Sequence, residues 1–180
     1  MQNNFQSLAY FIPEITIVIT ILLAIVSDLV NDFKKYTYYL VLFGLGLTGI
    51  LLLLDNSTST STLIFNDMLK FDSVSYYFKC IILLSTFSII LVSKYSKELD
   101  DEYRPEFNVL ILVVLLGMFL MTNSINLIMI YLALELVSIP SYVLAGILKN
   151  DQKSNEASLK YVIFGSFASR LLLYVFSLLY

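Results

Sequence analysis

The strongest indication of the fold is the stretch EFNVLILVVLLGMFLMTNSINLIMIYLALELVSIPSYVLAG, residues 106–146. Between Glu106 and Glu135 it contains no charged side chain. An α-helix needs about 20 mostly apolar residues to cross the hydrocarbon core of a bilayer. The stretch therefore predicts two membrane-spanning helices joined by a tight polar turn at Asn123 and Ser124. The apolar run Leu110–Leu116 does not alternate with polar residues, which excludes a strand of a membrane barrel.

The composition of the whole chain agrees with a membrane protein. Of 180 residues, 58% are hydrophobic and 14% charged, and the mean hydropathy is +0.82. A soluble globule of this size cannot bury so much apolar surface, and long apolar runs exclude intrinsic disorder. The chain has no His and one Cys, and it lacks a glycine-rich phosphate loop, which argues against a metal site, a haem or a nucleotide site. Basic and acidic residues mix in the loops, so no nucleic-acid partner is expected.

Polar breaks divide the chain into six predicted spans in a single membrane domain, residues 1–180. The breaks are DNSTSTST at Asp55–Thr62, ELDDEYRPE at Glu98–Glu106 and KNDQKSNE at Lys149–Glu156. The fold class is all-α, a polytopic membrane protein. Its helices are expected at about residues 8–30, 36–54, 74–94, 107–122, 125–148 and 157–179.

The basic residues predict how the spans are oriented. The N-terminus and the even-numbered loops carry Lys70 alone. Because basic loops stay on the side of synthesis, we expect the odd loops in the cytoplasm or matrix and both termini on the other side. The start, Met1–Ser7, has no positive segment, so no signal or import peptide is expected. The basic residues of the odd loops are Lys34, Lys35, Lys94, Lys97, Arg104, Lys149 and Lys153.

Glu135 is the ionisable residue that most strongly suggests a function. It lies at the middle of the fifth span, about 16 Å from either end, so its side chain cannot reach the membrane surface. A charge there costs about 2.5–3.5 kcal/mol on insertion scales. Tyr131, Ser138 and Tyr142 share its helical face, and Pro140 frees a backbone carbonyl nearby. We expect a hydratable pocket; the alternative is a neutral Glu135 that hydrogen bonds across a helix interface.

Further ionisable residues lie inside predicted spans. Lys160 is either the cationic partner of a buried carboxylate or a lysine that pairs with Glu156, four residues earlier. Arg170 is always charged, so we expect it to clamp a partner helix rather than to carry protons. Lys79 is expected to extend to the membrane surface, and Glu14 is expected to be interfacial, as is Asp28.

Two stretches resemble a known family. Residues 106–146, together with SNEASLKY at Ser154–Tyr161, resemble subunit 2 of the proton-pumping NADH:quinone oxidoreductase, respiratory complex I, which is called subunit N in bacteria. FIPEI from Phe11 and FDSVSYYFK from Phe71 stand where that family has similar features. The resemblance implies the first six helices of an antiporter-like subunit, in order.

The resemblance also implies a function. It implies a core membrane-arm subunit of NADH:ubiquinone oxidoreductase that moves protons when quinone is reduced elsewhere in the complex. Glu135 matches the family's helix-five glutamate by its ELVS context, and Lys160 matches the lysine of SLKY. The chain itself would hold no redox centre. FMN, iron–sulfur clusters and quinone would belong to other subunits, with structural phospholipids as further ligands.

The sequence departs from the family in helix six and in length. Arg170 stands where small residues are usual, and Val175 replaces a common glycine. The broken seventh helix and all later helices of the family do not follow Tyr180. We therefore expect a split subunit, completed by a second polypeptide and by other membrane-arm subunits; the alternative is a severed remnant. Thirteen Phe and thirteen Tyr favour an organelle gene and the mitochondrial inner membrane over a bacterial plasma membrane.

Two other functions remain open at this point. A cation/proton antiporter subunit would share the helix pair around Glu135 but would have no redox partner. A structural scaffold of the membrane arm would keep the polar stripe without conducting protons.

Overall fold

The computed structural model describes residues 11–30, 34–54, 62–64, 68–96, 99, 100 and 102–179; for residues 34, 35 and 62–64 it describes the secondary structure alone. Within these residues, six helices are long and apolar enough to cross a membrane, which confirms the predicted fold class. They are α2 (Ile12–Leu29), α3 (Lys34–Leu54), α4 (Ser73–Ser93), α5 (Arg104–Asn123), α6 (Leu127–Ala145) and α7 (Gln152–Leu179). Met1–Ser7, Asp55–Ser61 and Lys97 lie outside the described residues.

Two helices begin four or five residues away from their expected starts. The first span starts at Ile12 rather than at residue 8, with Pro13 in its first turn, where a missing amide costs nothing. The last begins at Gln152, five residues before the expected position 157. Asp151 starts this helix, because its side chain accepts a hydrogen bond from the amide of Lys153 at 3.2 Å. The polar segment before it is therefore shorter than predicted.

A small sheet was not predicted. Strand β1 (Thr62–Ile64) pairs antiparallel with β2 (Leu69–Phe71), with Thr62 opposite Phe71 and Ile64 opposite Leu69. The hairpin is held against the turn between α5 and α6, where the amide of Ile125 donates to the carbonyl of Met68 at 3.1 Å. Two short strands between apolar spans carry too little periodicity to be recognised in the sequence.

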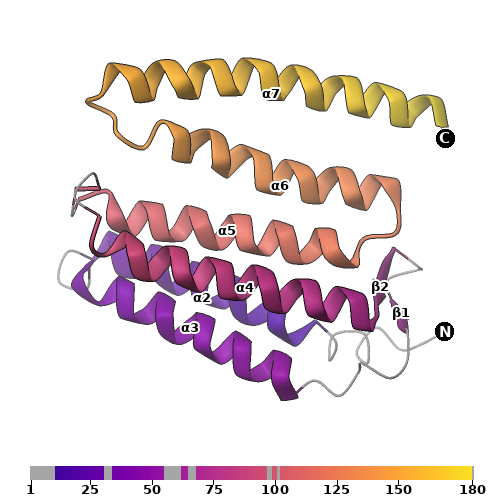
Figure 1. Ribbon diagram of the computed structural model, residues 1–180, viewed down its shortest axis with the longest axis horizontal. Helices are drawn as coiled ribbons and strands as arrows, with labels where there is room; N and C mark the ends of the chain where they lie inside the picture. Colours follow the sequence, from indigo (N-terminus) through magenta and orange to yellow (C-terminus); the bar gives the residue numbers. More distant parts are fainter. Residues whose placement is uncertain are drawn as a thin grey trace.

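The helices run side by side across the molecule, and successive connections alternate between its two ends (Figure 1). We call the end with the α2–α3, α4–α5 and α6–α7 connections the basic end. The other end, with the β-hairpin and the α5–α6 turn, is the hairpin end. α5 packs against α2, α4 and α6, while α7 packs against α6 at the edge of the row.

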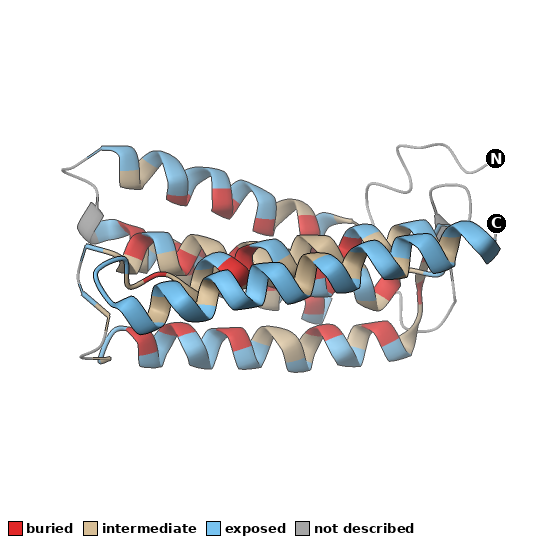
Figure 2. Ribbon diagram, turned by 90° about the horizontal axis from the view of Figure 1, so that it is seen from above, coloured by how far each residue is buried: buried red, intermediate tan, exposed pale blue. Residues whose placement is uncertain are grey.

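The apolar core lies among α2, α3, α4 and α5. Its buried side chains include Ile17, Leu45, Ile90, Leu112 and Phe119. The outward faces of the same helices carry large exposed apolar side chains, as expected where lipid replaces water (Figure 2). No residue of α7 is buried. The edge helix thus shows apolar surface on several sides.

Candidate functional site

A cavity of about 270 Å³ lies between α6 and α7 and contains the expected polar stripe. Tyr131, Glu135, Ser138 and Tyr142 all line it from α6. These positions recur every three or four residues, which places them on one face of a helix. The structure thus brings four of the predicted residues together at one cavity. The opposite wall belongs to α7 and is made of Tyr161, Gly165, Ala168, Ser169 and Leu172.

Glu135 is half-buried in this cavity rather than fully enclosed. The Tyr131 hydroxyl lies beside its carboxylate and interacts with it. The Ser138 hydroxyl donates to the carbonyl of Leu134 at 2.7 Å, so it can still accept a hydrogen bond from a ligand in the cavity. Among the described residues, no Lys or Arg forms an ion pair with Glu135. The carboxylate therefore faces space that water or a small cation can enter.

Two tyrosines and a glycine shape the basic-end side of the cavity. The rings of Tyr142 and Tyr161 meet edge to face with centroids 4.8 Å apart. Gly165 leaves the room that the Tyr142 ring occupies, because a methyl group there would overlap the Tyr142 hydroxyl. The close passage of α7 across Tyr142 thus depends on a residue without a side chain.

Serines of the SNEASLKY stretch join α7 to the end of α6. The Ser154 hydroxyl donates to the carbonyl of Ala145, and the Ser158 hydroxyl donates to that of Tyr142, both at 2.9 Å. Carbonyls at a helix C-terminus lack partners within the helix, so these hydroxyls supply hydrogen-bond donors at the end of α6. Neither serine was predicted to have this role.

Lys160 and Arg170 lie outside the cavity. Lys160 pairs with Glu156, and its side chain is 62% exposed. This geometry agrees with the alternative prediction, in which Lys160 pairs with Glu156 on the surface of its own helix. Arg170 is exposed on α7, one residue from Ser169, and has no ion-pair partner within the described part of the chain. Pro140 is buried, and α6 continues past it without interruption.

The structure overturns the expectation that Lys79 extends to the membrane surface, and it gives Glu14 a partner within the protein. Glu14 is fully buried, and Lys79 Nζ lies 2.6 Å from its Oε1. The centroids of the Phe71 and Phe119 rings lie 4.4 and 5.7 Å from the ammonium. Lys79 cannot extend to the surface because these rings cover it. The available signal was the presence of opposite charges at similar depth in the first and third spans, since intramembrane charges need partners.

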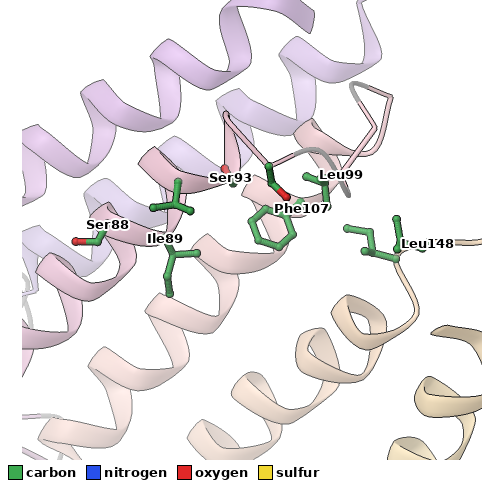
Figure 3. A pocket seen from close by; sticks show the side chains of 9 residues that line it. Ser88, Ile89, Ser93, Leu99, Phe107 and Leu148 are labelled. Carbon is green, nitrogen blue, oxygen red and sulfur yellow. The ribbon is translucent and has the colours of Figure 1, made fainter. Parts of the chain in front are cut away.

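A larger groove of about 530 Å³ lies near the basic end (Figure 3). Its lining combines apolar side chains with the hydroxyls of Ser88, Ser93 and Ser96, and no ionisable side chain takes part. The groove therefore offers no acid–base chemistry, and the smaller cavity at Glu135 is the stronger candidate site. In the described residues no cluster of three potential metal ligands occurs.

Comparison with known proteins finds similarity to subunits of one class of enzyme. Residues 124–180 match the family described as "NADH:quinone oxidoreductase/Mrp antiporter, TM". The chain is 35% identical to NADH-quinone oxidoreductase subunit N of Anaeromyxobacter sp., over 100% of this chain and 35% of the relative. It is 41% identical to subunit N 2 of Sorangium cellulosum, over 96% of this chain and 36% of the relative. The chain thus spans about a third of the length of these relatives.

Structural comparison gives the same result. The fold matches a chain of respiratory complex I from Thermus thermophilus with bound Aureothin, with a TM-score of 0.67 and 25% identity. The match covers 88% of this chain and 35% of that chain. The resemblance deduced from residues 106–146 and Ser154–Tyr161 is confirmed, and it extends over nearly the whole sequence.

Proposed function

From its similarity to subunit N of NADH-quinone oxidoreductases, we propose that this chain is part of a membrane subunit that moves protons in an enzyme of that kind. The single observation that carries the proposal is the position of Glu135. Its carboxylate faces the α6–α7 cavity, inside the segment that matches the NADH:quinone oxidoreductase/Mrp antiporter family. An intramembrane carboxylate beside a cavity is a functional site by default.

In this proposal Glu135 takes up and releases the proton. Tyr131 and Ser138 lie on the same face of α6 as Glu135. Their hydroxyl groups can hold a water molecule next to the carboxylate. Tyr142 and Tyr161 narrow the basic-end side of the cavity. Lys160 lies outside the cavity, where its exposed ammonium can contact a further helix that packs on α7.

The exposed surface of α7 supports further helices as partners. No residue of this helix is buried, and Arg170 lies on it without an ion-pair partner among the described residues. A charged guanidinium facing lipid is unfavourable, so we propose that it binds an acidic side chain of an adjoining helix. The longer relatives have room for such helices, which belong either to the same polypeptide or to a second one.

The rest of the enzyme supplies the redox chemistry in this proposal. FMN, iron–sulfur clusters and quinone are assigned to other subunits, with phospholipid filling gaps between the helices. The membrane is an energy-converting one, either a bacterial plasma membrane or the mitochondrial inner membrane. The relatives compared above are bacterial.

Replacing Glu135 by Gln tests the proposal. Gln keeps the size of the side chain and cannot ionise, so we expect the complex to assemble and proton pumping coupled to NADH oxidation to fall severalfold. The measurement is proton uptake or release per NADH oxidised in sealed membrane vesicles. Glu106→Gln is the matched control, because Glu106 is exposed and pairs with Lys149 at 3.4 Å, away from the cavity. An assembled Glu135→Gln complex that pumps at the control rate contradicts the proposal.

A cation/proton antiporter subunit is the second candidate, because the matching family description also includes Mrp antiporters. Copurification separates the two. Flavin and iron–sulfur proteins that copurify with the chain support the first, whereas hydrophobic subunits alone support the antiporter. A structural scaffold is favoured if proton flux survives the simultaneous replacement of Glu135 and Lys160.

A further inference from the structure

A buried ion pair at the hairpin end joins three helices. Glu14 on α2 meets Lys79 on α4 with 2.6 Å between Oε1 and Nζ, and their side chains are 0% and 4% exposed. Asn123, the last residue of α5, donates from Nδ2 to the same Glu14 oxygen at 3.2 Å. The α6–α7 cavity has a different lining and shares none of these residues.

The hydrogen bonding within this cluster is incomplete. Glu14 Oε2 and Asn123 Oδ1 are buried and receive no hydrogen bond from the described part of the chain. Lys79 has three N–H donors, and among the described residues Glu14 Oε1 is the one acceptor it reaches. Buried polar groups are nearly always paired with protein or ordered water. A water molecule can donate two hydrogen bonds to the free oxygens and accept one from Lys79, so it matches the unused groups.

Aromatic side chains cover the lysine of this cluster. Phe71 of β2 and Phe119 of α5 place their rings over Lys79. Lys70 and Asp72, which flank Phe71 in the sequence, pair with each other at 3.3 Å in a more exposed position. Glu14 and Lys79 therefore interact chiefly with one another and with Asn123.

We propose that Glu14, Lys79 and Asn123 bind a water molecule and form a second site of proton exchange. A proton moving from Lys79 Nζ to Glu14 breaks an N–H bond, forms an O–H bond and turns the ion pair into an amine and a carboxylic acid without changing the net charge. The bound water can then give a proton to the Lys79 amine while it takes one from hydronium, and the Glu14 carboxylic acid restores the original ion pair when it releases its proton to another water molecule. The proposal rests on the proposed proton-moving function, but it concerns different residues.

The first test is a density map of the intact membrane complex at a resolution that shows ordered water. We expect a peak within hydrogen-bonding distance of Lys79 Nζ, Glu14 Oε2 and Asn123 Oδ1. Well-defined side chains around an empty centre would overturn the proposal, as would a protein donor that occupies Glu14 Oε2. This measurement needs no variant, so it decides the question even if the substitutions below prevent assembly.

The second test is the double substitution Glu14→Gln/Lys79→Met in the same complex. It removes both charges while keeping similar side-chain volumes, and the amide oxygen introduced on α2 can still accept a hydrogen bond from Asn123. The exposed pair gives a matched control, Glu106→Gln/Lys149→Met. We expect the number of protons moved per NADH to fall in the assembled double variant and to stay unchanged in the control.

Running Glu135→Gln in parallel separates the two proposals. If Glu135→Gln lowers the proton ratio and the assembled Glu14→Gln/Lys79→Met variant does not, the second site is refuted and the proposed function stands. If neither variant lowers the ratio, both are refuted.

Discussion

Glu14 and Glu135 are the same residue type, but their different surroundings give them different roles. Glu14 is enclosed, with an ammonium 2.6 Å away, so its charge is held by a fixed partner. Glu135 is half-buried beside a cavity and has phenol and hydroxyl groups as neighbours. Removing one member of a buried pair leaves an unpaired charge, whereas changing a residue that lines a cavity leaves the packing largely intact. Substitutions at Glu135 are therefore the cleaner probes of function.

Asp72 provides a residue-scale prediction about pH. Its Oδ1 accepts from the amide and the hydroxyl of Ser75, at 2.8 and 2.9 Å, and caps the start of α4. The backbone hydrogen bond from Ser75, with smaller contributions from the Ser75 hydroxyl and Lys70, holds the pKa of Asp72 below its ordinary value against the opposing effect of burial. A lowered carboxyl pKa stabilises the fold above the unfolded value and loses that contribution as the pH falls through the folded value.

We therefore expect Asp72→Ala to lower stability by about 1 kcal/mol at neutral pH, the usual value of an N-cap. Asp72→Asn keeps a capping oxygen but cannot ionise, so it should retain most of the stability and remove this part of the acid sensitivity. Thermal unfolding of the detergent-solubilised protein between about pH 2 and 6 measures both effects. Equal acid sensitivity of the wild type and Asp72→Asn would contradict the assignment.

At the scale of elements, α5 organises the bundle because it packs against helices on both sides. At Gly117 it approaches α6 so closely that a Cβ atom would lie 2.7 Å from Val137 Cγ2 and 3.1 Å from the Val137 amide nitrogen. The tight turn at Ser124, fixed by the β-hairpin, holds the two helices antiparallel. Asn123 and the cavity-lining face of α6 thus take their positions from the same helix pair.

Gly165 and Gly46 give a matched pair of element-scale substitutions. A methyl group at Gly165 would overlap Tyr142, while a methyl group at Gly46 meets no atom within 4 Å. We expect Gly46→Ala to stabilise α3 by up to about 1 kcal/mol through helix propensity. Gly165→Ala should instead cost about 1–3 kcal/mol by overpacking, and it should displace Tyr142 from the cavity.

Thermal unfolding of both variants measures the difference, and proton pumping shows whether the cavity is affected. If Gly165→Ala is as stable as Gly46→Ala and pumps normally, the close contact between α6 and α7 is not what shapes the site.

For the whole molecule, the alternating connections place the odd loops at one end and the hairpin at the other (Figure 1). Lys94, Arg104, Lys149 and Lys153 belong to the basic end, and Lys70 belongs to the hairpin end. By the positive-inside rule, we expect the basic end to face the side of synthesis. The buried Glu14–Lys79 pair then lies near the outer side of the membrane.

Cysteine labelling tests this orientation. Cys80 is the single cysteine of the chain, so Cys80→Ser provides a background without thiols. In that background, a membrane-impermeant thiol reagent should label Lys153→Cys from the inner side and Met68→Cys from the outer side; both positions are exposed. Labelling of the two in the reverse pattern, in sealed vesicles of known orientation, would show that the topology is inverted.

Local sequence patterns were sufficient to predict the class of fold, the number of spans and the polar face around Glu135. Each of these follows from the spacing of residues along one helix or from the length of an apolar run, and none depends on how helices pack. The family resemblance likewise came from local motifs, and the comparisons confirmed it. The position of Ser138 relative to Glu135 could be predicted for the same reason, because the two residues lie three positions apart on one helix.

The tertiary structure alone decided which charges meet. Glu14 and Lys79 are 65 positions apart, and Glu14 and Asn123 are 109 apart. The β-hairpin that covers them comes from a segment without a helix signal. Lys160, by contrast, faces its own neighbour Glu156 rather than Glu135. Helical periodicity fixes directions within one helix, but the rotation of each helix about its axis is set by packing against its neighbours, and that rotation selects the partners.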